Sequence, residues 1–155
     1  MSYRITGLER EQFAHYFDMD DAGLAEYDAV RVTAGADKGW PCRISLQDAK
    51  AGETLVLLNH VSHNVATPYR SSYAIYLREG ASAPAEYIDE TPPVFEGRPM
   101  AFRAFDMHGM LKNAALALPG QADAKIRELF ESDNIAYINA HNAAHGCFSA
   151  KIERA

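Results

Sequence analysis

The stretch TLVLLNHV, residues 54–61, decides the fold, because its apolar residues fall at both odd and even positions. Side chains alternate between the two faces of a β-strand, so a strand that is apolar at both is buried on both sides. Its longest aliphatic run, Leu55–Leu58, is far shorter than the roughly 20 residues of a membrane-spanning helix. We therefore expect residues 54–61 to be a central strand that other parts of the chain cover on both sides.

Further short segments on both sides of this stretch have the period of two that is typical of strands. Gly, Pro, Asp and Ser residues separate them, as expected for the turns of an antiparallel sheet. The strands predicted in this way span residues 30–33, 43–46, 73–78, 101–106, 135–141 and 147–152.

Two short helices are predicted near the N-terminus. Thr6 and Glu9 match a capping box, and apolar residues within 13–17 then share one helical face. A second helix follows Asp18 or Asp20 and reaches about residue 27, with acidic residues at its start, where the helix dipole favours negative charge. These aspartates are therefore predicted to be caps and not catalytic carboxylates.

One late helix is predicted at about residues 121–132, where an apolar stripe recurs with helical spacing and Asp123 can pair with Arg127. Residues 80–99 contain four prolines and several acidic residues, which predicts an extended surface excursion. The resulting fold class is α+β: a mainly antiparallel β-sheet with two short N-terminal helices and one late helix, in a single domain of residues 1–155.

The composition excludes several classes of function. The chain has 155 residues, with 15 basic and 21 acidic side chains for a net charge of −6. Binders of nucleic acid or anionic lipid usually carry a basic excess, so we expect no nucleic-acid and no membrane partner. The first residues do not resemble a secretory signal, and two cysteines are few for a secreted scaffold. We expect a soluble cytoplasmic protein with free thiols, a Cys42–Cys147 disulfide being the alternative.

Polar residues are densest between Tyr137 and Phe148. His141 is predicted to end a strand, and the following turn returns Cys147 close to it. A histidine beside a cysteine can lower the thiol pKa and create a nucleophile, which makes His141 and Cys147 the candidate catalytic residues. The alternative is structural, with His141 and Asn142 bonding the turn and Cys147 filling the core.

The histidines do not form a recognisable metal motif. His60 and His63 form one short cluster, and His141 and His145 form another. Histidines at such short spacings can bind transition metals, but the chain has no Cys-x-x-Cys and no His-Glu-x-x-His pattern. We therefore predict no bound metal and no cofactor.

Arginines lie within the predicted strands and not only on solvated helices, as Arg43, Arg70 and Arg103 illustrate. Burying an unpaired charge costs several kcal/mol, so each of these side chains needs a partner. That partner is either an internal carboxylate, such as Asp48 or Asp106, or an anionic ligand held by the guanidinium fork.

Several short blocks in order along the chain are weak singly but specific together. They are RITGL (4–8), PCRISL (41–46) with DA (48–49), LLN (57–59), His63, PYRSS (68–72), HNA (141–143), GCF (146–148) and ERA (153–155). With these blocks the chain resembles the bacterial family catalogued as domain of unknown function 1203 over essentially its whole length.

The resemblance implies a compact bacterial protein of one domain and brings no activity with it. The family often has Pro where this chain has His145, which weakens any metal site that needs that histidine. The polar positions that match are Cys42, Arg43, His63, Tyr69, Arg70, His141, Asn142 and Cys147.

Two functions remain open. In the first, the Pro-Cys-Arg segment, the Pro-Tyr-Arg segment and the His-Asn turn converge on one concave site for a small anionic molecule, bound or chemically transformed. Its ligand-binding residues are then Cys42, Arg43, His63, Tyr69, Arg70, Arg103 and Asn142. In the second, the chain is a non-enzymatic partner-binding domain in which the Arg, His and Cys residues are structural. A homodimer is compatible with either function.

Overall fold

The strand predicted at residues 54–61 is the middle strand of a three-stranded antiparallel sheet in the computed structural model, which describes all 155 residues. This strand, β3 (Thr54–His63), lies between β2 (Val30–Thr33) and β4 (Ser71–Arg78). Leu57 is opposite Val30 on one side and opposite Tyr76 on the other. The prediction of a central strand is confirmed.

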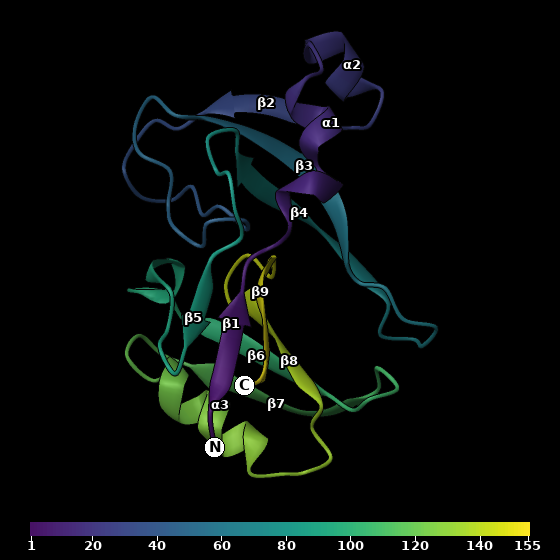
Figure 1. Cartoon of the computed structure of the whole chain (residues 1–155), viewed down its shortest axis with the longest axis vertical. Coiled ribbons are helices and arrows are strands. Elements are labelled where there is room, and N and C mark those ends of the chain that lie inside the picture. The colour runs from purple at the N-terminus through teal and green to yellow at the C-terminus, as the bar shows by residue number, and fades with distance from the viewer.

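The other six strands form a second antiparallel sheet, in the order β5-β1-β9-β8-β6-β7 (Figure 1). The two ends of the chain meet in it, because Tyr3 of β1 is opposite Arg154 of β9. The predicted fold class, α+β and mainly antiparallel, is confirmed, with the strands divided between two sheets. The strands of this sheet are β1 (Tyr3–Thr6), β5 (Glu86–Ile88), β6 (Met100–Phe105), β7 (Leu111–Ala117), β8 (Tyr137–Asn142) and β9 (Phe148–Arg154).

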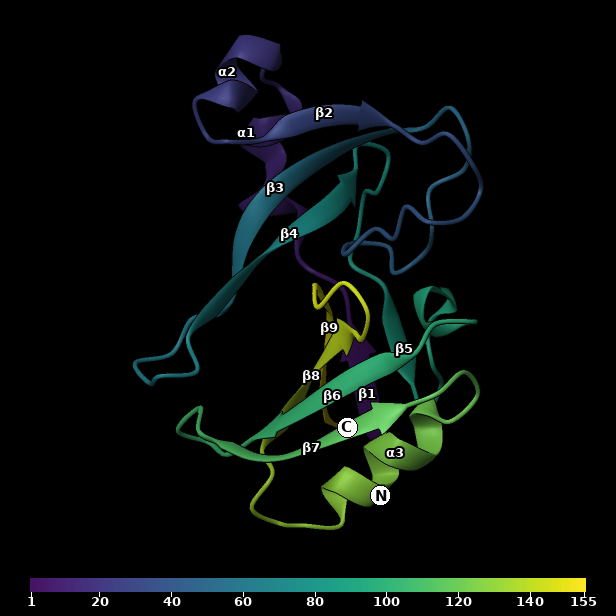
Figure 2. The same cartoon turned by 180° about the vertical axis from the view of Figure 1, so that it is seen from behind.

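The late helix, α3 (Ala122–Phe130), covers one face of the six-stranded sheet (Figure 2). Its apolar stripe, including Ile126, is buried in one cluster with Phe102 and Ile138 from the sheet. On its outer side Arg127 pairs with Asp123 at 3.1 Å, as the spacing of four residues predicts.

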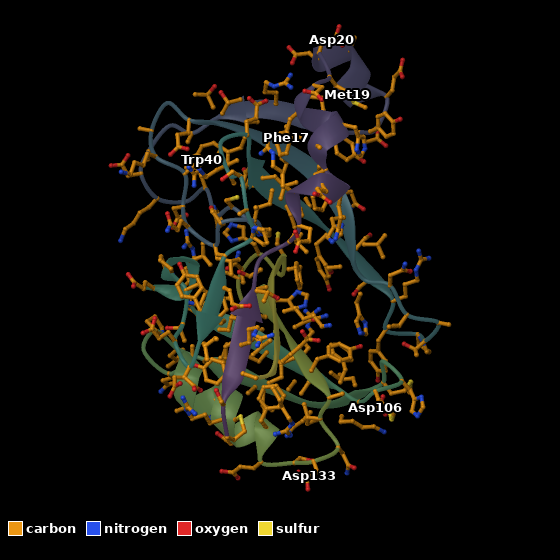
Figure 3. All side chains as sticks on the ribbon, viewed as in Figure 1. Phe17, Met19, Asp20, Trp40, Asp106 and Asp133 are labelled. Atoms are coloured by element: carbon orange, nitrogen blue, oxygen red, sulfur yellow. The ribbon has the colours of Figure 1, made fainter.

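The N-terminal helices α1 (Ala14–Phe17) and α2 (Asp21–Ala25) pack on one face of the three-stranded sheet. Leu24 is buried there with Val56. The side chain of Asp20 accepts a hydrogen bond from the Gly23 N–H at 2.8 Å at the tip of α2 (Figure 3), which confirms the predicted cap. No helix of the structure has the length and apolar character to cross a membrane. Two 3₁₀ turns complete the helical elements, at Arg10–Gln12 and Pro93–Phe95.

The two sheets contact each other through polar and aromatic side chains. His63 of β3 bonds the Tyr137 hydroxyl of β8 at 2.6 Å, and Arg103 of β6 donates to the Tyr73 hydroxyl of β4 at 2.6 Å. Buried polar groups need partners, and here each sheet supplies the partners of the other. Both cavities described below lie along this junction.

Three local predictions are wrong. Thr6 ends strand β1 and makes no capping box, because residues 3–6 pair with both β5 and β9. Residues 43–46 form a tight turn and not a strand. Residues 80–99 are not wholly a surface excursion, since they contain β5 and the buried side chain of Phe95.

Candidate functional site

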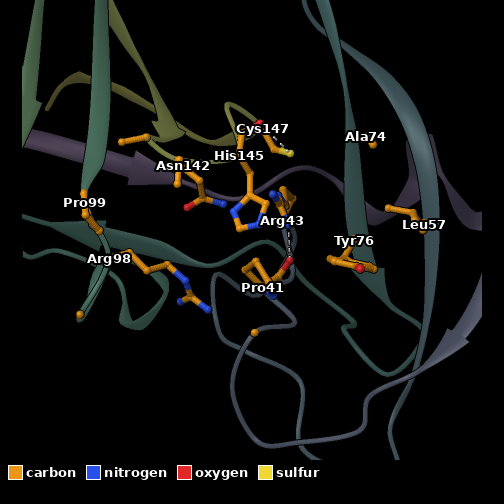
Figure 4. Close-up of a pocket in the computed structure, with 14 residues that line it drawn as sticks. Pro41, Arg43, Leu57, Ala74, Tyr76, Arg98, Pro99, Asn142, His145 and Cys147 are labelled. Carbon is orange, nitrogen blue, oxygen red and sulfur yellow. Dashed lines mark hydrogen bonds between the residues drawn. The ribbon is translucent and has the colours of Figure 1, made fainter.

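A cavity of about 480 Å³ opens between the two sheets (Figure 4). Leu57 of β3 and Tyr76 of β4 give it an apolar wall, and Arg43 enters from the turn that follows Pro41. The opposite side consists of Gly97–Pro99 and of the β8–β9 turn, residues 142–147. Five segments of the chain therefore form this site.

Arg43 is only 3% exposed and has no carboxylate partner. Its Nε donates to the Phe148 carbonyl at 2.8 Å, and its Nη1 donates to the Pro41 carbonyl. Its Nη2 has no acceptor in the protein, and the residue lines the cavity. Burial lowers the pKa of Arg43 to about 10, so the guanidinium is still charged at neutral pH.

The turn that carries Arg43 is closed by Cys42. The Cys42 N–H donates to the Gln47 carbonyl at 3.0 Å, and the Cys42 carbonyl accepts from the Leu46 N–H at 3.0 Å. Its sulfur accepts backbone N–H groups of Ile44 at 3.4 Å and Arg78 at 3.3 Å. Because of these local hydrogen bonds, residues 43–46 form a turn and not the predicted strand. Cys42 is fully buried and does not line the cavity.

Both carboxylates considered as internal partners for the arginines are bound to other cations. Asp48 forms two hydrogen bonds with Arg98, at 2.7 and 2.9 Å, and Asp106 pairs with Lys112 at 3.2 Å. Arg98 also lines the cavity, but with its charge balanced. Arg43 is therefore the buried cation of this site that lacks a counter-ion.

The β8–β9 turn adds a second polar group without a partner. Oδ1 of Asn142 is enclosed and makes no hydrogen bond, although Asn142 lines the cavity. Cys147 also lines it, and both cysteines are free. No hydrogen bond joins Cys147 to His141, whose Nδ1 instead donates to the Gly146 carbonyl at 3.0 Å. The geometry needed for a His-activated thiol is thus not formed.

A smaller cavity, of about 220 Å³, lies beside the first and holds several of the other predicted residues. Its polar and aromatic lining consists of Tyr69, Arg70, Ser71, Tyr73, Arg103, Phe105, Asn139 and His141. The expected convergence on a single site is therefore corrected to two sites. The physical reason is the strand geometry, because His141 and Asn142 are consecutive in β8 and point to opposite faces.

His63 lines neither of these cavities. Its Nδ1 donates to the Tyr69 carbonyl at 2.9 Å and its Nε2 accepts from the Tyr137 hydroxyl, so both ring nitrogens are used in joining segments of the fold. Sequence reasoning missed Tyr76 and Arg98. Tyr76 was predicted only as part of a strand, and Arg98 stands in GRP (97–99) inside the segment expected to be a surface excursion.

No group of three or more His, Cys, Asp or Glu side chains in the structure could hold a metal ion. The larger cavity combines hydrogen-bonding groups and the unbalanced positive charge of Arg43 with an apolar wall.

Comparison with known proteins identifies the family of this chain. No curated protein and no solved structure matches the chain. The profile of a family described as "Protein of unknown function (DUF1203)" matches residues 39–154, a range that includes every residue lining either cavity. Because this match covers well over half of the sequence, the chain belongs to the DUF1203 family.

Proposed function

We propose that this protein binds a small anionic molecule in the larger cavity, with Arg43 as the anchor. The observation that carries the proposal is the buried Arg43 guanidinium, which has no carboxylate partner and a free Nη2 at the cavity. A buried charge without a counter-ion costs several kcal/mol, and a bound carboxylate or phosphate would offset that cost. The guanidinium fork suits either group.

The shape of the cavity supports a small organic anion. About 480 Å³ lies within the usual range of small-molecule sites, roughly 300–1,000 Å³. Leu57, Ala74 and Tyr76 can hold an apolar body beside the Arg43 guanidinium. Local positive charge of this kind attracts anions even though the whole chain is acidic.

The single tryptophan offers a direct measurement of ligand binding. Trp40 lies between two residues of the cavity lining, Gly39 and Pro41, and its ring is 5.3 Å from that of Tyr76. We expect benzoate to change the Trp40 fluorescence in a saturable way and to bind at least about tenfold more tightly than benzamide, its neutral isostere. Equal binding of the two compounds would contradict the proposal.

Two variants test the location. Arg43→Gln removes the charge and should abolish the preference for benzoate, whereas Arg127→Gln, on the solvent-facing side of α3, should retain it. Because Arg43 also bonds two buried carbonyls, Arg43→Gln could lower stability. Ala144→Phe avoids this problem, since Ala144 is exposed on the turn and a larger side chain there occupies the cavity. Unchanged benzoate binding in Ala144→Phe would instead favour the structural role of Arg43 that the partner-binding alternative requires.

A further inference from the structure

The smaller cavity contains a buried histidine with one nitrogen left free. His141 is 2% exposed, and its ring is held edge-on by Tyr73 at 5.0 Å and by Phe148 at 5.9 Å. Its Nδ1 lies 3.0 Å from the Gly146 carbonyl, and a carbonyl can only accept. The ring proton is therefore on Nδ1, and Nε2 has a lone pair with no donor in the protein. Burial lowers the pKa of His141 to about 4, which keeps this ring neutral at pH 7.

Two arginines face the same cavity without a carboxylate. Arg103 donates to the Tyr73 hydroxyl at 2.6 Å, and Arg70 donates to Oδ1 of Asn64 at 3.2 Å. Neither forms an ion pair, and no Asp or Glu lines the cavity. Each guanidinium has five N–H donors, so most of them remain available to a ligand.

These groups define what a ligand must offer: oxygen acceptors for the arginines and a donor for Nε2 of His141. We propose that the smaller cavity is a second binding site, specific for a small oxyanion that also carries a hydroxyl group. Inorganic phosphate and a small hydroxycarboxylate share this chemistry. Sulfate and acetate do not, since at neutral pH they only accept hydrogen bonds. This site does not depend on the function proposed for the larger cavity.

Inorganic phosphate and glycolate are small enough to enter the cavity of about 220 Å³, so they are suitable probes. Sulfate is the matched anion without a hydroxyl for phosphate, and acetate is the matched anion for glycolate. Because a site built to bond a hydroxyl leaves its acceptor unpaired with the wrong ligand, we expect the hydroxyl-bearing member of a pair to bind at least tenfold more tightly. A preference for phosphate over sulfate would identify the ligand as a phosphate, and a preference for glycolate over acetate would identify it as a hydroxycarboxylate.

The experiment is a titration of the full chain at pH 7, followed by the ring ¹⁵N resonances of its histidines in long-range ¹H–¹⁵N spectra. The free protein should show His141 with its proton on Nδ1. Phosphate or glycolate should move the His141 Nε2 resonance in the direction of hydrogen-bond acceptance, and sulfate or acetate should not. The proposal is overturned if the hydroxyl-bearing and hydroxyl-free anions bind equally, or if none of them moves His141.

Variants separate this site from the larger cavity. Arg70 is exposed, so Arg70→Gln should fold normally and weaken phosphate or glycolate binding several-fold. Arg4→Gln is the matched control, because Arg4 is a surface arginine of β1 paired with Glu86. Ala144→Phe fills the larger cavity and should leave binding at His141 intact. Loss of binding in Ala144→Phe but not in Arg70→Gln would place the anion in the larger cavity and overturn the second site.

Discussion

The buried polar side chains of this protein are positioned by backbone carbonyls more than by opposite charges. Arg43 donates to the carbonyls of Pro41 and Phe148, and His141 donates to that of Gly146. A carbonyl fixes the orientation of a guanidinium or an imidazole without neutralising it. The polar atoms left over, Nη2 of Arg43 and Nε2 of His141, are therefore free for a ligand.

Because His141 is buried in its neutral form, we expect the stability of the protein to depend on pH. Its pKa is lowered from 6.5 to about 4 by burial and, secondarily, by the charge of Arg103. As the pH falls from 6.5 to 4, the unfolded chain binds a proton that the folded chain does not, so the free energy of unfolding decreases by about 1.4 kcal/mol per pH unit. This contribution is fully present above pH 6.5.

In urea denaturation between pH 4.5 and 7.5, His141→Gln should show a shallower loss of stability than the unsubstituted protein, by on the order of 2–3 kcal/mol over that range. His108→Gln, at an exposed position, should behave like the unsubstituted protein. A His141→Gln variant with the same pH dependence as the unsubstituted protein would show that His141 binds its proton equally well when folded.

At the scale of elements, the turn of residues 41–48 decides where the larger cavity forms. It packs against the residue that follows β1, where Gly7 leaves room for the chain. A Cβ atom at Gly7 would lie 2.0 Å from the Ile44 carbonyl oxygen and 3.1 Å from that of Arg43. Only glycine allows this approach, so Gly7 supports the turn that presents Arg43.

Gly7→Ala should therefore destabilise the protein by about 2 kcal/mol or more, because two backbone segments must separate to relieve the overlap. Gly35→Ala is the matched control, since no atom lies within 4 Å of a Cβ built at Gly35. Both can be compared by urea denaturation, with benzoate binding as a second measurement on the folded fraction. Equal stability of the two variants would show that the turn accommodates a methyl group without cost.

At the scale of the whole molecule, the two sheets are joined by polar and aromatic contacts and not by one continuous apolar core. The buried apolar residues fall into three separate clusters, of which the two larger lie under α3 and under α1 and α2. Between them lie the His63–Tyr137 and Arg103–Tyr73 bonds and the two cavities. The sites exist because side chains from both sheets do not fill this junction.

Removing one of these bonds should reduce the stability of the whole protein. Tyr137→Phe keeps the ring and deletes the hydroxyl, which leaves Nε2 of buried His63 without a donor and should cost about 1–3 kcal/mol. Tyr27→Phe, at an exposed position where the hydroxyl makes no hydrogen bond, should cost almost nothing. If thermal unfolding gave the two variants the same stability, the polar junction would contribute nothing to holding the sheets together.

The sequence determined the elements whose pattern is local. Alternation placed β2, β4 and β6, the continuous apolar run placed β3, the apolar stripe placed α3, and the position of Asp20 before a helix identified it as a cap. It also identified most of the polar residues that line the cavities. It missed β1, β5 and β7, which have few residues or weak alternation and gain their stability from the strands beside them.

Only the tertiary structure decided how those elements combine. The pairing of β1 with β9, the division of the strands into two sheets and the use of Asp48 by Arg98 all join residues that are distant in the sequence. The same applies to the sites: the sequence places His141 beside Asn142, but strand geometry directs them into different cavities. Which charges remain unbalanced depends on where every other charge finds its partner, and that is settled only when the whole chain has packed.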